Sequence, residues 1–215
     1  MKCLVNIEKI AKLVLFTAVI ATVGFVAGCR TNQYCVPQSD VAEFENPIPI
    51  PAGFYMRNEL RDKWFKTKGA FTRVDMPLGS VVFETAKARL KNAFTKDEDV
   101  DITSISSVPG SAFYTIAHES RRAEVGMLIK LQSLDFQFDA GVTECTMEFA
   151  VEDEKGENII EKEYSSTGQK NGGVLWGGLG GDDEKITRGT EVALCNIYSQ
   201  LLDDIREQVV PAMNK

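Results

Sequence analysis

The sequence predicts an α+β fold in which two amphipathic helices pack on one face of a mostly antiparallel β-sheet. Two patterns support this prediction. Apolar residues recur at three- and four-residue steps over residues 82–94 and again over residues 194–209, as they do in a helix with one buried face. Between these segments, side chains over residues 142–152 alternate with a period of two, which is typical of a strand with one buried face.

The chain starts with a pattern typical of an export signal. Lys2, Lys9 and Lys12 precede an uncharged apolar run over residues 13–28, LVLFTAVIATVGFVAG. The run is shorter than the ~20 apolar residues that a membrane-spanning helix needs, and it ends in small residues instead of a basic cluster. We therefore expect residues 1–28 to be a cleaved signal peptide and not an uncleaved membrane anchor.

The end of this run reads VAGC over residues 26–29 and resembles the lipobox of bacterial lipoproteins. The resemblance implies that Val26, Ala27 and Gly28 are the recognition residues for cleavage. It also implies that Cys29 carries a diacylglycerol and an amino-terminal acyl chain such as palmitate, so that several chains hold the protein on a membrane. Arg30 stands where some lipoproteins carry an Asp that retains them in the inner membrane. We therefore expect a lipid-anchored protein of the bacterial outer membrane that faces the periplasm.

Cleavage before Cys29 would leave 187 of the 215 residues, which suits one domain with a tether. It removes three of the 24 basic residues and one of the 31 acidic residues, so 21 basic and 30 acidic residues remain and the net charge is −9. Such a surface repels anionic head groups and the phosphates of nucleic acids. Because no basic cluster interrupts this trend, we expect no nucleic-acid binding.

Residues 29–52 are expected to form the lipid anchor and a proline-rich tether, and residues 53–215 a single α+β periplasmic domain. Pro47, Pro49 and Pro51 favour extended backbone and remove hydrogen-bond donors from a sheet. The alternative is that residues 45–54, ENPIPIPAGF, lie along the domain surface as an ordered arm.

The first part of the domain is expected to contain a strand and a helix. Residues 54–66 mix aromatic and charged side chains and fit either a short helix or a strand with a turn, whereas residues 68–76 predict the first strand. Ser80 is a candidate N-cap for the helix that follows. The buried face of this helix is predicted to consist of Val82, Phe83, Ala86, Leu90, Ala93 and Phe94.

The middle of the domain is expected to complete the sheet. Residues 100–105 predict a short strand, residues 112–124 a short helix, and residues 124–139 a long central strand. Residues 142–164 predict a hairpin, because Gly156 in the turn DEKGEN permits the positive φ of a tight reversal. The first hairpin strand is expected to bury Thr143, Cys145, Met147, Phe149 and Val151.

A long helix is predicted at the end of the domain, from about residue 183 to residue 210. Gly189 weakens its first turns, and Pro211 is expected at its end. The predicted apolar stripe consists of Leu194, Ile197, Leu201, Ile205 and Val209.

Three cysteines, Cys35, Cys145 and Cys195, would remain in the mature chain with unmodified thiols. If the compartment is oxidising, Cys145 and Cys195 are the pair we consider for a disulfide, which would join a strand to the final helix. The alternative is two packed, reduced thiols.

Catalytic patterns are weak in this sequence. His118 is the only histidine, so a hydrolase with Ser120 or Cys145 as its nucleophile would have to use it. Sequence neighbours do not face one another as triad members do, and a surface or cap role for His118 is the alternative. CxxC, HExxH and His/Cys clusters with ligand spacing are missing from the sequence. We therefore expect a non-enzymatic protein without a metal or other cofactor.

Residues 168–185, GQKNGGVLWGGLGGDDEK, contain seven glycines ahead of the final helix. The segment lacks GxxxxGK[ST] and GxGxxG, and Asp182 and Asp183 would repel a phosphate at the helix start, so a flexible flap is favoured over a phosphate-binding loop. Its apolar tip can dip into lipid, fold back on the domain or dock on a partner. We expect docking, because aromatic side chains anchor interfaces. The candidate contact residues are Val174, Leu175, Trp176 and Leu179.

The order of lipobox, tether, helix, strand EVGMLIKLQSLDFQF, hairpin MEFAVEDEKGENIIEKEY and final helix is similar to that of YajG-like lipoproteins and of the auxiliary lipoproteins of ABC-type envelope transporters. The resemblance spans about residues 69–209. It implies an accessory subunit of an envelope assembly, for transport or cell-wall maintenance, that binds a protein partner between membrane and periplasm. The alternative function is binding of a small apolar or lipid ligand, gated by the glycine-rich flap.

Replacement of the lipid-bearing thiol tests the membrane anchor. We expect Cys29→Ser to move the protein from the membrane fraction to the soluble fraction, because the acyl chains can no longer be attached. Fractionation of cells followed by immunoblotting measures this change, and a variant that stays firmly membrane-bound would refute the anchor.

Overall fold

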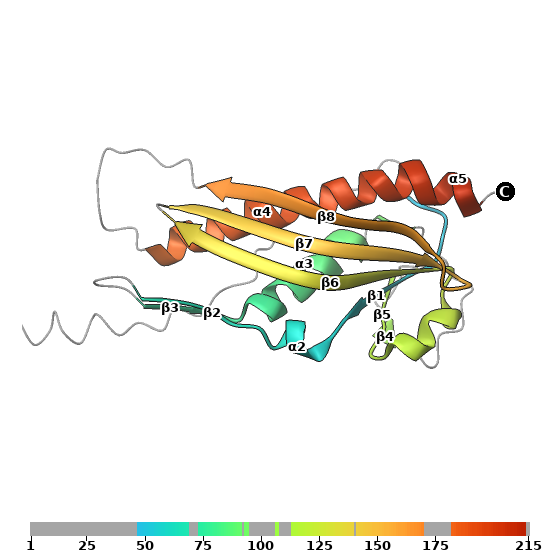
Figure 1. Cartoon of the computed structure of the whole chain (residues 1–215), viewed down its shortest axis with the longest axis horizontal. Coiled ribbons are helices and arrows are strands. Elements are labelled where there is room, and N and C mark those ends of the chain that lie inside the picture. Colours follow the sequence, from blue (N-terminus) through green and yellow to red (C-terminus); the bar gives the residue numbers. More distant parts are fainter. Residues whose placement is uncertain are drawn as a thin grey trace, which may run out of the picture.

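The computed structural model describes residues 47–68, 73–91, 93–94, 106–107, 113–139, 141–169 and 182–213. These residues form a mixed α+β fold, as the sequence predicts: a six-stranded sheet, two main helices and a separate two-stranded sheet (Figure 1). The described elements are β1 (Ala52–Met56), α2 (Asn58–Arg61), β2 (Phe65–Lys68), β3 (Arg73–Met76), α3 (Leu78–Lys91), β4 (Ser106–Ser107), β5 (Phe113–Thr115), a 3-10 helix (Glu119–Glu124), β6 (Met127–Asp139), β7 (Val142–Asp153), β8 (Asn158–Gln169), α4 (Asp182–Asp204), a π turn (Ile205–Val209) and α5 (Val210–Met213).

The main sheet has the strand order β4-β5-β1-β6-β7-β8. β6, β7 and β8 form a long antiparallel meander, and β4 is antiparallel to β5. β1 runs parallel to both of its neighbours, with Phe54 opposite Thr115 of β5 and Ile129 of β6. The last three residues of this strand belong to the segment over residues 54–66 that the sequence left open, and the same segment also contains α2 and the start of β2.

The end of the proline-rich segment is part of the folded domain. Ile48 and Ile50 alternate with the prolines and are buried in the main core. The backbone N–H of Ile48 donates to the carbonyl of Ala93 at 2.8 Å. For residues 47–52 the ordered arm is therefore the correct alternative, and the folded domain begins earlier than residue 53, where the sequence placed its start.

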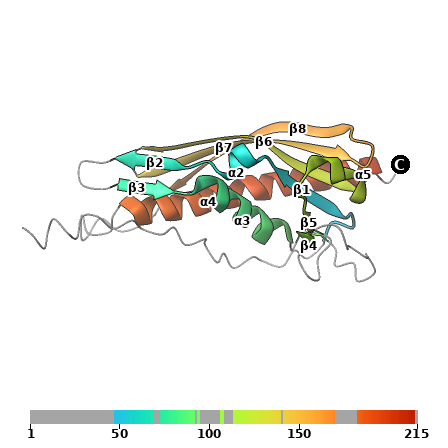
Figure 2. The same ribbon diagram turned by 90° about the horizontal axis from the view of Figure 1, so that it is seen from below.

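Helices α3 and α4 cover one face of the sheet, which we call the inner face (Figure 2). The predicted stripe of the final helix is buried there, as are the predicted inward residues of β7. Tyr198 of α4 lies edge-on to Phe149 of β7 with ring centroids 5.9 Å apart, and its hydroxyl donates to the carbonyl of Val82 in α3 at 3.1 Å. One side chain therefore joins both helices and the sheet.

Several predicted boundaries are wrong. α3 begins at Leu78, directly after Pro77, so Ser80 lies inside the helix and does not cap it. Residues 113–124 form β5 and a 3-10 helix instead of one short helix, because β5 pairs with the distant β1. The final helix continues past Pro211 to Met213 through the π turn. The strand predicted over residues 100–105 lies outside the described residues.

The predicted hairpin of β7 and β8 is confirmed. Gly156 has a φ of +85°, and the carboxylate of Asp153 accepts hydrogen bonds from the backbone N–H groups of Lys155 and Glu157 at 2.9 and 2.8 Å. The alternation along β7 is also confirmed on the inner face. On the opposite face, however, Ala150 and Glu152 are buried although the sequence predicts them to be solvent-exposed.

A close approach of α4 to the sheet requires two glycines. A Cβ atom built on Gly168 of β8 would lie 1.8 Å from the carbonyl oxygen of Gly189, and one built on Gly189 would lie 2.5 Å from Oγ1 of Thr143. Because neither distance leaves room for a methyl group, the helix can cross the strands here only with glycine at both positions. Gly189, which lowers helix propensity, therefore serves packing.

Introduction of a methyl group at this crossing should destabilise the domain. We expect Gly168→Ala to lower the free energy of unfolding by about 1–3 kcal/mol, since the helix must move away from the strand. Thr167→Ala, at the exposed neighbouring position, is the control and should cost less than about 1 kcal/mol. Urea denaturation followed by circular dichroism measures both values, and equal effects would argue against a tight crossing.

Candidate functional site

Several predicted site residues lie outside the part of the chain that the structure describes. These are the lipobox residues and the apolar tip of the glycine-rich flap: Val26, Ala27, Gly28, Cys29, Val174, Leu175, Trp176 and Leu179. Their roles stay predictions. Among the described residues, no helix is long and apolar enough to cross a membrane.

The disulfide considered from the sequence is not formed, because Cys145 and Cys195 are both free thiols in the structure. Cys145 points from β7 into the core, where burial raises its pKa to about 12 and leaves it a neutral packing group. Cys195 lies on α4 and accepts a contact from the guanidinium of Arg89 in α3 at 2.6 Å. Its thiol therefore faces the neighbouring helix and not β7.

His118 acts as a local helix cap. Its ring nitrogen Nδ1 accepts a hydrogen bond from the backbone N–H of Ser120 at 3.4 Å and lies 2.9 Å from the Ser120 hydroxyl, at the start of the 3-10 helix. Both residues are exposed, whereas Cys145 is buried in the main core. The structure thus brings His118 and Ser120 together through capping geometry, and it keeps Cys145 apart from them.

The outer face of the sheet, opposite the helices, has two different ends. At one end, a small second core lies on β1, β5 and β6, and its members include Tyr114, Ile116, Val125 and Leu128. The 3-10 helix follows Ile116 and leads into Val125, so it covers this end. Glu152 lies opposite Leu128 of this core and Ala150 lies opposite Lys130, so both buried residues are at the covered end of the face.

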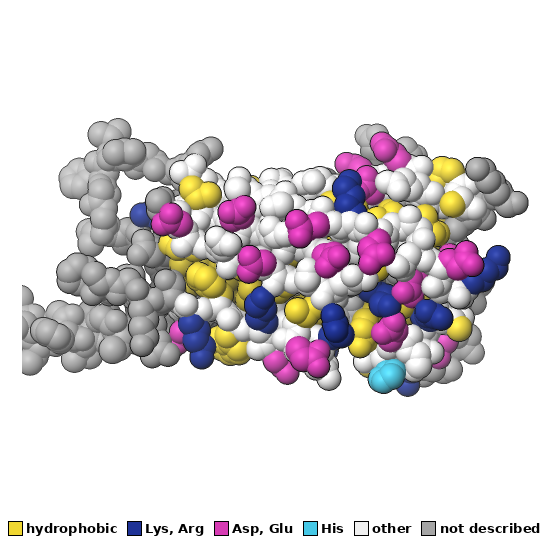
Figure 3. Space-filling view, in the orientation of Figure 1, with side chains coloured by type: hydrophobic (Ala, Val, Ile, Leu, Met, Phe, Trp, Pro, Cys, Tyr) yellow, Lys and Arg dark blue, Asp and Glu magenta, His cyan; other side chains and the backbone are white. Residues whose placement is uncertain are grey.

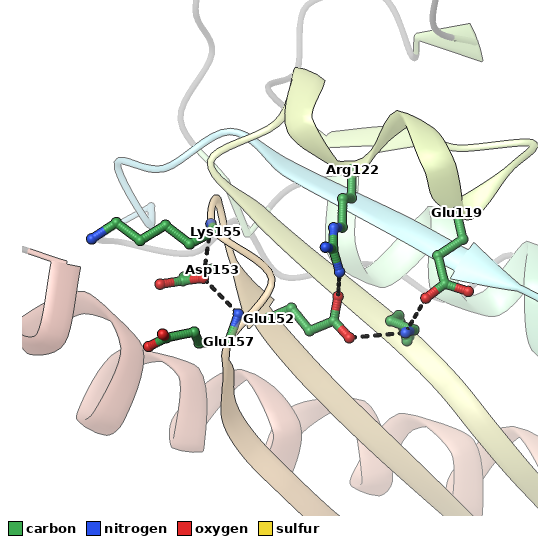
Figure 4. A network of polar contacts seen from close by, with 7 residues as sticks. Glu119, Arg122, Glu152, Asp153, Lys155 and Glu157 are labelled. Carbon is green, nitrogen blue, oxygen red and sulfur yellow. Dashed lines mark hydrogen bonds and ion pairs between the residues drawn. The ribbon is translucent and has the colours of Figure 1, made fainter.

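Four charged side chains connect the 3-10 helix to the sheet at the covered end (Figure 4). The side chain of Glu152 is only 8% exposed, and its two oxygens accept from Lys130 Nζ at 2.8 Å and from Arg122 Nη1 at 3.2 Å. Glu119 also accepts from Lys130. Burial opposes the charge on Lys130, but the hydrogen bonds and charges of Glu119 and Glu152 raise its pKa. The network contains two cations and two anions and is compensated internally.

The other end of the outer face is acidic and has no covering element among the described residues. Carboxylates project from all three strands of the meander, and Figure 3 shows acidic side chains gathered over β7 and β8. We call this surface the open acidic face. Its carboxylate residues are Asp135, Asp139, Glu144, Glu148, Glu161 and Glu163.

The carboxylates of the open acidic face are not engaged in ion pairs within the described residues. None of its six carboxylates forms an ion pair with another described residue, and the side chains that contact two of them are the neutral amides of Gln137 and Asn158. Glu148 and Glu163 are directly opposite each other on β7 and β8. Like charges directly opposite each other destabilise a sheet. The presence of two glutamates here therefore cannot be explained by a contribution to the stability of the fold.

The geometry suits a broad cationic surface better than a metal ion. Side chains two residues apart on one face of a strand are separated by about 6.6 Å, so the carboxylates form rows instead of a compact cage. In the described part of the chain, no group of three acidic, histidine or cysteine residues is arranged to hold a metal ion. Lys or Arg side chains of a partner could reach several of these rows at once.

The open acidic face was missed in reading the sequence, although part of its signal is visible there. Glu144, Glu148, Glu161 and Glu163 occupy the polar positions of the predicted hairpin, and their shared sign marks a one-signed surface. Asp135 and Asp139 join them only through the register of β6 with β7, which places Asp135 opposite Thr146. That register includes an irregularity between Leu131 and Ser133, which the sequence pattern does not reveal.

No model of a known protein family matches this chain, and a search of curated proteins finds no match. The resemblance to envelope lipoproteins therefore stays a prediction.

Loss of the buried carboxylate should disrupt the covered end. We expect Glu152→Gln to lower the free energy of unfolding by about 2–3 kcal/mol, because Lys130, whose side chain is 17% exposed, loses the more buried of its two anions. Glu119→Gln removes a carboxylate that is 43% exposed and should cost less than about 1 kcal/mol. Denaturant unfolding of both variants measures the difference, and equal costs would mean that Glu152 is not the centre of the network.

Proposed function

We propose that this protein is a lipid-anchored, non-enzymatic accessory protein of the bacterial envelope, and that its open acidic face binds a protein partner with a basic surface. The observation that carries the proposal is the contrast between the two ends of the outer face. Charges are paired where the 3-10 helix covers the sheet and are unpaired among the described residues where it does not.

The unpaired carboxylates would attract a partner surface of opposite charge. A basic partner surface would bring cations close to Glu148 and Glu163 and remove the repulsion between these opposed side chains. It would also be steered toward the face by a chain whose net charge after signal cleavage is −9. Screening is strong beyond about 8 Å at physiological salt, so direct contact is required for most of the gain.

The resemblance of residues 26–29 to a lipobox supports a membrane location for the proposed interaction. Acyl chains on Cys29 would hold the protein at the outer membrane, with the domain in the periplasm. The chain from Cys29 to Pro47, where the described domain begins, can span at most about 60 Å when fully extended. A partner that binds the open acidic face would therefore be engaged close to the bilayer surface, and Trp176 in the flap is proposed as a second contact with it.

Reversal of charge on the face tests this function. We expect the double variant E148K/E163K to recover at least about tenfold less of the partner than the wild type, after crosslinking in intact cells and mild detergent extraction. Mass spectrometry of the co-purified material identifies and quantifies the partner. Raising the salt concentration before crosslinking should weaken recovery by the wild type in the same direction.

E59K/E154K is the matched control, because it reverses two exposed carboxylates on α2 and in the β7–β8 turn, outside the open acidic face. It should recover the partner as the wild type does. Full recovery by E148K/E163K would refute the proposed site. Isolation of the wild-type protein with a bound lipid and without a protein partner would refute the accessory function and favour the ligand-binding alternative.

A further inference from the structure

β8 is the last strand of the main sheet in the order β4-β5-β1-β6-β7-β8. It is 12 residues long, from Asn158 to Gln169, whereas strands are commonly 5–6 residues long. Figure 1 shows it along the margin of the sheet, with α4 behind it. Within the described residues, the backbone pairing of β8 is entirely with β7.

α4 covers the inner side of β8. Ile160, Tyr164 and Gly168 are buried beneath the helix. At the rim, Lys162 Nζ contacts Asp204 Oδ2 at 2.7 Å and Asn196 Nδ2 donates to Ser166 Oγ at 3.2 Å. These contacts are made by side chains. The backbone N–H and C=O groups of β8 that point away from β7, along the edge of the sheet, are therefore without a backbone partner among the described residues.

β8 lacks the structural protections of an edge strand and is guarded mainly by its charged side chains, Glu161, Lys162 and Glu163. Natural edges are commonly short, bulged, interrupted by proline or guarded by lysine. β8 contains no proline, and its pairing is irregular only near the turn, between Val151 and Glu152 of β7. Its one lysine, Lys162, is held by Asp204 of α4. A long row of backbone groups is therefore suited to pairing with another extended segment.

We propose that β8 accepts an extended segment of the partner protein by strand addition, and that this segment carries Lys or Arg at alternate positions. Glu161 and Glu163 are exposed on the outer side of β8, and cross-strand neighbours lie about 4.5–5.5 Å apart. Alternate cations on an added strand would face these carboxylates. The inference rests on the proposed function, because it states how the partner of the open acidic face is bound.

A second copy of this chain is a poorer occupant of the same edge. Antiparallel pairing of two β8 strands would bring Glu161 and Glu163 of both copies onto one face, where like charges repel. The side of the added strand that faces α4 would meet polar groups such as Asn196 and Asp204. The partner segment is thus expected to alternate basic residues with small polar residues.

A synthetic decapeptide that alternates Lys and Thr probes this edge in the full acylated protein in detergent micelles. We expect it to bind and to slow hydrogen exchange of the β8 amides at least tenfold, while α4 amides are unchanged. The same peptide with N-methyl groups on alternate residues keeps the charge but cannot pair, so it should bind at least tenfold more weakly. E161K/E163K should also lose binding, whereas Glu154→Lys should keep it.

The outcomes separate strand addition from the function on which it rests. Equal binding of the N-methylated peptide, or absence of protection in β8, would overturn strand addition. If E148K/E163K still fails to recover the cellular partner in that case, the open acidic face remains the proposed binding site and only strand addition to β8 is rejected. Protection of β8 that rises with protein concentration in the absence of peptide would overturn the proposal in favour of a second copy.

Discussion

The packing of α4 on the inner face of β7 and β8 is the contact on which the rest of the structure depends. The helix can lie this close because Gly168 and Gly189 meet without side chains. Tyr198 then reaches both Phe149 of the sheet and the backbone of α3, so the two helices and the meander share one core. Because both helices lie on the inner face, any cover on the outer face must come from other elements.

The outer face consists of two regions, one covered by the 3-10 helix and one open. At the β1 and β5 end, the 3-10 helix supplies a small apolar core, and Glu152 balances two cations beside it. Over the rest of β6, β7 and β8, the described chain supplies no covering element, and the six carboxylates there form no ion pairs with described residues. A fold that compensates charges where it needs them for stability and leaves them unpaired elsewhere is consistent with a surface kept for a partner.

Local periodicity in the sequence was sufficient for the elements that bury one face by themselves. The final helix and the β7–β8 hairpin follow from the spacing of their apolar residues and from Gly156 in the turn, whereas β6 was predicted from the length of its segment. β1 could not be recognised in this way, because a five-residue strand is stabilised by parallel neighbours more than 50 residues away. The arm over residues 47–52 depends likewise on a distant contact, between Ile48 and Ala93.

The candidate site could likewise be predicted only in part from the sequence. Composition established the sign of the surface but not its location, since only strand register brings Asp135 and Asp139 beside the carboxylates of the hairpin. The sequence left the pairing of Cys145 and Cys195 open for a related reason: their spacing does not show that one thiol points into the core and the other toward α3.

Site-specific photocrosslinking in living cells tests the central claim that the outer face, and not the helical face, meets the partner. A photoreactive amino acid would replace Ser165, which is exposed on the outer side of β8, or Ser199, which is exposed on α4. The account predicts a crosslinked partner from position 165 and none from position 199. A partner captured from position 199 and not from position 165 would contradict it.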